Sequence, residues 1–492
     1  MKKRICFLLL LFLIVPVLFS GCGKDFVSVN SKNVDEYSIT IDLDEENHKA
    51  TCTQNVNYIN NSSTTLNNIM FHLYANAFSS EAVNKPVSSL YENKAYYNGF
   101  SEGKIEINSL KVNDEEIEIC LAGTDKTLLD VKLRNGLNSG ERVNVEFKYE
   151  LTIPNINHRF GYGENTINLG NFYPIASVFD GDLFNENGYH YNGDPFYSNI
   201  SNYEIVINHN KEYIVASSGK QISKEINGET AQTKLSAKAV RDFALVVSNK
   251  FNVVEQKLNG TTISYFYYND ENSEKSLETC KRSVETFNEL FGYYPYETLC
   301  VVESNFVHGG MEFPSMVLIS DNLDTYEDYT QTIIHEIAHE WWYAVVGNDQ
   351  FSCGWLDEGL AEFSTALFFE KNADYNVKYE DIISNARSSY SLFVEVYTDV
   401  FGNVDTSMNR KLNEYKTEPE YVYIAYVKGM LLFDSLRDIV SENKLLKGLK
   451  KYYKENQGRN ATPGNLIYSL EKATGYKLQE FFDSWIDGKV VI

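Results

Sequence analysis

Two histidines and two glutamates have the residue types and spacing of a mononuclear zinc hydrolase site. His335 and His339 flank Glu336 in the string His-Glu-Ile-Ala-His, and Glu358 follows after eighteen intervening residues. Side chains four residues apart lie on one face of a helix, so both imidazoles can bind the same Zn²⁺ ion. Glu336 can then serve as general base toward a water activated by the metal. Glu358 is the candidate third ligand, and three protein ligands leave one position open for substrate.

The five-residue motif by itself also fits an amphipathic core helix. Apolar residues surround it, namely Ile333, Ile334, Ile337, Trp341 and Trp342. In that interpretation the histidines would only need hydrogen-bond partners. The segment 355–363 is itself helix-patterned and acidic on one side, and this second signal favours the metal site.

The elements around the motif alternate between strands and helices. The pattern predicts strands at 262–268, 299–303 and 316–320, and helices at 273–291, 326–346 and 355–370. Longer helical patterns occupy residues 420–492. Strands followed by helices in one unit predict an α/β zinc-peptidase domain over residues 256–492, with a helical C-terminal part.

The preceding region, residues 36–255, is β-rich. Apolar and polar residues alternate at 37–43, 51–58 and 143–149, with turn signals such as Asn227-Gly228 between such runs. This predicts an N-terminal antiparallel β-sandwich or saddle domain, and a multidomain α+β chain as a whole.

The first residues have the composition of a targeting segment. A basic stretch at 2–4 precedes an apolar run from Ile5 to Phe19, and small residues then precede Cys22. This resembles a bacterial lipoprotein processing site, so we expect a signal peptide at 1–21, a lipid on Cys22 and a linker at 22–35. The alternative is an uncleaved membrane anchor. Both interpretations place the remaining chain outside the cytoplasmic membrane, anchored to the cell surface.

The composition argues against two classes of site. The formal net charge is −24, which disfavours a nucleic-acid partner because such partners require basic patches. The cysteines beyond Cys22 are five, scattered and without CxxC spacing, so no thiolate metal site is indicated. Most should be small buried hydrophobes, although a Cys280–Cys300 disulfide stays open.

These motifs resemble those of the gluzincin zinc aminopeptidases, the aminopeptidase N family, over most of residues 36–492. The His335-Glu-x-x-His339 motif, eighteen residues and Glu358 match that family's pattern. The resemblance implies one Zn²⁺ per chain and a thermolysin-like catalytic domain. Many members continue into a long C-terminal helical domain, so its absence after residue 492 implies a more open cleft.

Two further motifs support the resemblance. The string Gly309-Gly310-Met311-Glu312 corresponds to a family substrate-binding motif, with Phe313 where the family has asparagine. By resemblance, these residues bind substrate and Glu312 binds its free α-amine.

Tyr426, in the string Tyr-Val-Lys-Gly, corresponds to the family tyrosine that stabilises the oxyanion, with Tyr421 five residues earlier. Glu164 in the β-rich region is a further candidate for a second amine contact, although a structural role is favoured.

The combined interpretation is a zinc aminopeptidase that acts on peptides. A free-amine site such as Glu312 would separate it from the first alternative, a zinc endopeptidase with the same ligands. The second alternative is a non-catalytic, peptide-binding surface lipoprotein. The joint presence of the ligands, Glu336 and Tyr426 counts against that alternative.

Overall fold

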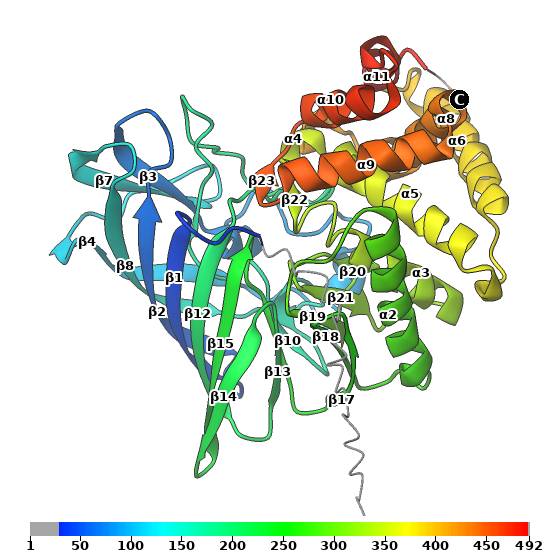
Figure 1. Cartoon of the computed structure of the whole chain (residues 1–492). Helices are drawn as coiled ribbons and strands as arrows, with labels where there is room; N and C mark the ends of the chain where they lie inside the picture. The colour runs from blue at the N-terminus through cyan, green and yellow to red at the C-terminus, as the bar shows by residue number, and fades with distance from the viewer. Residues whose placement is uncertain (1–28, 491–492) are drawn as a thin grey trace, which may run out of the picture.

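The computed structural model describes residues 29–490 of the 492-residue chain. The predicted signal peptide and the predicted lipid site Cys22 lie outside the described residues. Within 29–490, no helix has the length and apolar character needed to cross a membrane. Figure 1 shows a β-rich lobe on the left and a helix-rich lobe on the right.

The β-rich lobe is organised around an eight-stranded sheet of order β14-β15-β12-β1-β2-β8-β4-β5. Its strands are β1 (Asp35–Asp44), β2 (Lys49–Ile59), β4 (Lys104–Val112), β5 (Glu115–Glu116), β8 (Arg142–Thr152), β12 (Ser201–Asn210), β14 (Lys220–Asn227) and β15 (Thr230–Val240). Strict alternation along β1 buries Tyr37, Ile39 and Ile41 on one face, as period-two patterning requires. The pairs are antiparallel except β1–β12, which is parallel.

Two four-stranded antiparallel sheets complete this lobe. One has the order β11-β3-β7-β6 and the other β13-β16-β10-β9. Their strands are β3 (Leu66–His72), β6 (Leu121–Ala122), β7 (Leu128–Leu137), β9 (Phe160–Tyr162), β10 (Ile167–Leu169), β11 (Ile175–Ala176), β13 (Ile214–Ser217) and β16 (Leu245–Ser248). Two short helical pieces, η1 (Tyr74–Phe78) and α1 (Glu92–Ala95), connect β3 to β4.

The second lobe begins with a five-stranded sheet of order β17-β18-β19-β21-β20. Its strands are β17 (Asn252–Leu258), β18 (Thr261–Tyr267), β19 (Thr298–Ser304), β20 (Gly310–Met311) and β21 (Met316–Ser320). The three central strands are parallel, and β20 forms an antiparallel edge. The expected boundary at 255/256 falls inside β17, so the change of sheet lies before Asn252.

Helices cover this sheet and make up the rest of the lobe (Figure 1). They are α2 (Ser273–Leu290), α3 (Tyr326–Ala338), α4 (Gln350–Cys353), α5 (Trp355–Lys371), α6 (Tyr379–Phe401), α7 (Glu418–Tyr421), the π-helical η4 (Val422–Val427), α8 (Lys428–Val440), α9 (Glu442–Asn456), α10 (Pro463–Thr474) and α11 (Gln479–Ile486). Two 3₁₀ turns, η2 (Ala373–Tyr375) and η3 (Leu412–Glu414), also lie among these helices. So does a short pair of parallel strands, β22 (Val346–Gly347) and β23 (Arg459–Asn460). The α+β fold class is thereby confirmed.

The motif helix α3 is shorter than the pattern predicts. It starts where the Thr325 side chain accepts the N–H of Asp328 at 3.1 Å, and it ends at Ala338 instead of Val346. Beyond that point the carbonyls of Trp342 and Tyr343 face His339 and Arg241 side chains, at 3.2 and 2.8 Å. Side chains therefore replace the helical N–H partners that a longer helix would supply.

Most of the described cysteines are small buried residues, as expected, and none of them forms a disulfide. Five cysteines are free within the described residues, and three of them, Cys52, Cys280 and Cys300, are buried. The disulfide left open between Cys280 and Cys300 is therefore absent.

Candidate active site

Helices α3 and α5 bring the three predicted metal ligands to one point. Nε2 of His335 lies 3.1 Å from Nε2 of His339, and Oε2 of Glu358 lies 3.4 and 3.2 Å from these two atoms. His339 and Glu358 are buried, because α3 and α5 pack against each other. Two imidazole nitrogens and one carboxylate oxygen at one point are a donor set that fits a catalytic zinc ion.

The charge state of Glu358 also suits a cation. Burial would raise the pKa of this carboxyl, but the facing His339 and His335 lower that pKa to about 2. Glu358 is therefore ionised at neutral pH. Burial lowers the pKa of both imidazoles, but the facing Glu358 carboxylate outweighs it, raising the pKa of His339 to about 10 and that of His335 well above its usual value. A metal ion must therefore displace protons from both imidazoles before they can donate electron pairs.

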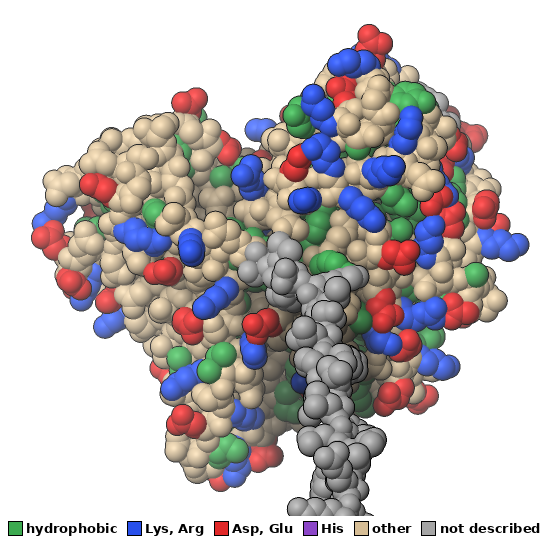
Figure 2. All heavy atoms as spheres, in the orientation of Figure 1, with side chains coloured by type: hydrophobic (Ala, Val, Ile, Leu, Met, Phe, Trp, Pro, Cys, Tyr) green, Lys and Arg blue, Asp and Glu red, His purple; other side chains and the backbone are tan. Residues whose placement is uncertain are grey.

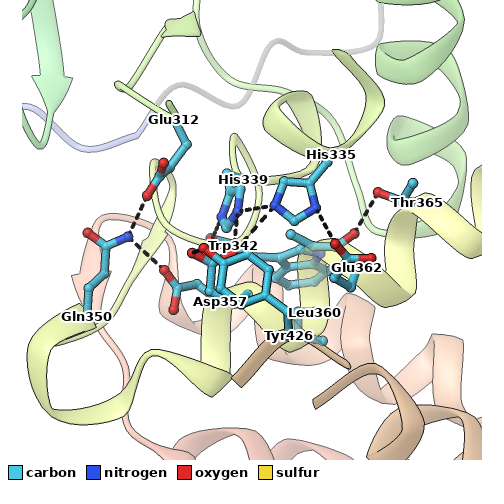
Figure 3. A network of polar contacts seen from close by, with 12 residues as sticks. Glu312, His335, His339, Trp342, Gln350, Asp357, Leu360, Glu362, Thr365 and Tyr426 are labelled. Carbon is cyan, nitrogen blue, oxygen red and sulfur yellow. Dashed lines mark hydrogen bonds and ion pairs between the residues drawn. The ribbon is translucent and has the colours of Figure 1, made fainter. Parts of the chain in front are cut away.

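A second layer of contacts orients both imidazoles (Figure 3). Nδ1 of His339 faces the carbonyl oxygen of Trp342 at 3.2 Å, and Nδ1 of His335 lies 3.3 Å from Oε1 of Glu362. Such partners fix the ring that presents the opposite nitrogen to a metal. Glu362 was not predicted, although its position one helical turn after Glu358 could have indicated it.

Glu336 lies between the ligand cluster and the edge strand β20, because its carboxylate contacts Gly310. Its side chain is buried, and its Oε2 atom has no hydrogen-bond partner among the described residues. Burial raises the pKa of this carboxyl to about 7, against the opposing effect of His335 and His339. A pKa near the operating pH is what a general base requires.

Tyr426 reaches the ligand cluster from the π-helical segment η4 (Figure 3). Its hydroxyl donates to Oε1 of Glu358 at 2.6 Å, and its ring stacks on His335 with 5.9 Å between centroids. The position depends on close helix packing, because a Cβ on Gly359 of α5 would meet Cα of Gly429 in α8 at 2.8 Å. Single π-helical turns are frequent at functional sites.

Glu312 follows the edge strand β20 and is held by a buried amide (Figure 3). Nε2 of Gln350 donates to Oε1 of Glu312 at 2.6 Å and to Oδ2 of Asp357 at 2.8 Å. Gly309, Gly310 and Glu312 line the same cleft as the metal ligands. The Met311 side chain does not, because it points into the core and is only 1% exposed.

Glu340 fixes the segment that carries Glu312. Its two carboxylate oxygens accept the N–H of Ser315 at 2.9 Å and the hydroxyl of Tyr294 at 2.8 Å. The end of the motif helix is thus tied to the loop that begins three residues after Glu312. This contact gives the buried Glu340 a positioning role.

Asp194, not Glu164, is the second carboxylate beside Glu312. One carboxylate oxygen from each of Asp194, Glu312 and Glu358 lies within 4.8 Å of the other two. Asp194 also pairs with the buried Arg159. Glu164 is exposed and does not line the cleft, so its proposed amine contact was wrong. The string Gly193-Asp194-Pro195 looks like an ordinary turn, and no local signal identifies it.

The cleft that joins these residues has a volume of about 600 Å³ and is lined by both lobes. Eight of its lining side chains are Asp or Glu, whereas Lys94 and Arg159 are its two Lys or Arg residues. Such a lining produces a negative potential that favours cationic ligands.

Residues 275–485 match the family model described as the Peptidase family M1 domain. The helix-rich lobe thus contains a peptidase family M1 domain. Relatives of this chain confirm the resemblance to the aminopeptidase N family. Aminopeptidase N of Lactobacillus delbrueckii subsp. lactis is 25% identical over 228 residues, covering 43% of this chain and 26% of the relative. Aminopeptidase N of Streptomyces lividans is 25% identical over 236 residues, covering 43% and 25%.

The M1 fold extends over nearly the whole chain. An M1 zinc metallopeptidase from Deinococcus radiodurans superposes with a TM-score of 0.64 and 15% identity, covering 94% of this chain and 95% of that one. A mutant of that protein bound to a Tyr-Ser-Ala substrate gives a TM-score of 0.65 at 14% identity. The chain spans only about a quarter of the length of the aminopeptidase N relatives, but nearly the full length of these structures.

Proposed function

We propose that this M1 protein is a zinc aminopeptidase that hydrolyses the N-terminal peptide bond of peptides. The observation that carries the proposal is the position of Glu312 and Asp194 within 4.8 Å of the ligand Glu358. Two carboxylates beside a metal site can hold an ammonium group, because hydrogen bonds between charged partners are the strong ones. A substrate held there by its free α-amine presents its first peptide bond to the metal site.

The metal would be one Zn²⁺ per chain, held by His335, His339 and Glu358. When bound, zinc supplies a Lewis acid that polarises the substrate carbonyl and the attacking water.

Side chains of the chain itself would transfer the proton, stabilise the developing negative charge and orient the substrate. Glu336 accepts the proton of the attacking water and delivers it to the leaving amine. The Tyr426 hydroxyl donates to the carbonyl oxygen as negative charge develops there. Glu312 and Asp194 bind the α-amine. This contact holds the first peptide bond in the correct orientation for attack.

The edge strand β20 supports an extended substrate. It pairs on one side only, with β21, through Gly310 and Met311. An extended peptide can add to such an edge by main-chain hydrogen bonds. The absence of side chains at Gly309 and Gly310 leaves the strand accessible from the cleft.

The deciding experiment is hydrolysis of an amino-acid amide panel by the purified chain, with and without a chelator. N-acetylated versions of the same substrates are the controls. An aminopeptidase cleaves the free-amine substrates only and stops after metal removal. Equal internal cleavage of N-acetylated peptides would favour the endopeptidase, and absence of any hydrolysis by the zinc-loaded chain would favour the peptide-binding alternative.

We also propose that the protein is extracytoplasmic and anchored through a lipid on Cys22. One structural observation supports an orientation for such an anchor. Val29, the first described residue, packs against Gly458 just after α9. Cys22 precedes Val29 by seven positions, and seven residue steps span at most about 25 Å.

The helix next to this point is basic, in contrast to the net charge of −24. Lys447, Lys450 and Lys454 are exposed on α9, and Figure 2 shows lysine and arginine side chains gathered over this helix. Lysines on one helix face suit an anionic lipid surface. None of the cleft-lining residues lies in α9, so contact there would leave the cleft open.

Mass spectrometry of the native protein tests the anchor. A chain that begins at a lipid-modified Cys22 supports it, and Cys22→Ser should prevent processing. An unmodified N-terminus downstream of Cys22 would refute it.

A further inference from the structure

The cleft contains a carboxylate that the proposed reaction does not use. Glu418, at the start of α7, lines the cleft, and its side chain is only 12% exposed. Its Oε2 atom accepts the hydroxyl of Ser88 at 2.8 Å, and Nδ1 of His308 lies 3.5 Å from its Oε1 atom. Three segments distant in sequence therefore meet at this carboxylate.

No cation neutralises Glu418 among the described residues. Burial raises the pKa of its carboxyl to about 7, and the opposing contribution comes from the Ser88 hydrogen bond. The neighbouring His308 is neutral at pH 7, because burial and the nearby Arg159 and Lys94 lower its pKa to about 3. A buried carboxylate without a counter-charge is unfavourable, and a cationic ligand would remove that cost.

Glu418 lines the same cleft as the amine site and the oxyanion tyrosine. Its neighbour His308 lies two residues before strand β20 and four residues before Glu312. In the other direction, α7 continues to Tyr421, whose ring packs edge-on against Tyr426 at 5.8 Å. A substrate with its amine at Glu312 and its carbonyl at Tyr426 would therefore occupy the cleft that Glu418 also lines.

Aromatic rings complete the wall. The ring of Tyr91 packs edge-on against His308 with 5.1 Å between centroids, and Tyr91 and Tyr189 both line the cleft. Rings of this kind favour the alkyl stem and the charged end of a basic side chain. Lys94 is the opposing charge, but it is exposed at the rim, where solvent and salt screen it.

We propose that Glu418 binds the ammonium or guanidinium group of a basic first residue, so that the enzyme prefers peptides with N-terminal lysine or arginine. This preference rests on the proposed aminopeptidase function. It also agrees with the excess of acidic side chains around the cleft.

Pairs of nearly isosteric substrates test the charge requirement directly. The full-length zinc-loaded protein is assayed with the p-nitroanilides of arginine and citrulline, and of lysine and norleucine. We expect kcat/KM for arginine to exceed that for citrulline at least tenfold. Glu418→Gln should bring this ratio close to one, and Glu418→Lys should invert it. Glu414→Gln is the control, because Glu414 is an exposed residue outside the cleft and should leave the ratio unchanged.

A second measurement keeps the inference testable without turnover. Calorimetry compares the binding of arginine amide and citrulline amide by the wild type and Glu418→Gln. Tighter binding of arginine amide that the substitution abolishes supports the site, even in a protein that hydrolyses nothing. A wild-type ratio near one, or a ratio that Glu418→Gln leaves intact, overturns the role of Glu418. A wild-type protein that binds arginine amide more tightly than citrulline amide but hydrolyses no free-amine substrate would instead overturn the proposed aminopeptidase function.

Discussion

A Cβ atom added to Gly310 would lie 2.4 Å from Oε1 of Glu336. The substrate strand and the proposed general base are therefore in direct contact, with no side chain between them. This contact holds the Glu336 carboxylate against the edge of the sheet and beside the metal ligands. It also explains why glycine is needed at position 310, where any side chain would displace the carboxylate.

Gly310→Ala should therefore damage catalysis more than binding of the metal. The added methyl group forces Glu336 away from its position, and we expect kcat to fall at least tenfold while zinc content stays near one per chain. Gly309→Ala is the matched comparison, because its Cβ would meet nothing closer than Thr332 at 3.8 Å. Its loss of activity should be clearly smaller. Equal losses in the two variants would show that the Gly310–Glu336 contact is unimportant.

Glu336→Gln should separate proton transfer from metal binding. Glutamine keeps the size of the side chain but cannot accept the proton, so kcat should fall by roughly 10²–10⁴. Zinc should be retained, because Glu336 is not among the three facing donors. Metal analysis and steady-state kinetics on the same preparation check both points, and near-native turnover would exclude Glu336 as the base.

Substitution of a metal ligand, unlike Glu336→Gln, should remove the zinc ion itself. His335→Ala or Glu358→Ala takes away one of three donors and should abolish stoichiometric zinc, with loss of activity. Chelation of the wild type should produce the same loss. Full zinc occupancy in the double variant His335→Ala/His339→Ala would refute the assignment of the site.

The parts of this site that the sequence predicts are those set by local geometry. His335 and His339 must lie together once α3 forms, because helical spacing fixes their faces. The strands and helices of the second lobe follow their hydrophobic periods closely, and α2 and α5 occur within a residue of their expected ranges. Glu358 follows His339 after eighteen intervening residues, yet the resemblance to a known ligand pattern was enough to predict it.

The missed parts depend on contacts between distant segments. Asp194 comes from the β-rich lobe and reaches Glu312 only because the two lobes meet at the cleft. Glu418 becomes buried through Ser88, which is 330 residues away in sequence. The Tyr343 carbonyl, just beyond α3, accepts a hydrogen bond from Arg241, a residue of the first lobe. No local pattern around these residues carries that information.

Substitution at the proposed amine site should reduce activity toward substrates with a free α-amine only. Glu312→Ala removes a charge-assisted hydrogen bond to the α-ammonium, a contribution of about 1.5–3 kcal/mol. We expect kcat/KM for free-amine substrates to fall at least tenfold, and residual cleavage of N-acetylated peptides to stay unchanged. Asp194→Asn should act in the same direction, and the amide keeps a polar partner for Arg159. Equal losses on free and acetylated substrates would indicate a structural effect only.

The preference for basic residues should depend on pH in a defined direction. The pKa of Glu418 is raised to about 7 by burial, so its carboxyl is mainly protonated at pH 6 and mainly ionised at pH 8 in the free enzyme. Only the ionised form pairs with a guanidinium, and kcat/KM reports the ionisation of the free enzyme. The arginine-to-citrulline ratio should therefore rise by up to about tenfold between these two pH values.

The other groups near Glu418 do not change charge in this range. Burial lowers the pKa of His308 to about 3, and it raises the pKa of Tyr189 to about 12 and that of Tyr91 above its usual value, so none of these three groups titrates between pH 6 and pH 8. Titrations at the metal site affect both substrates and cancel in the ratio. Measurement of both substrates across pH 6 to 8 should give a rising ratio for the wild type and a flat one for Glu418→Gln. A ratio that rises equally in both proteins would assign the effect to another group.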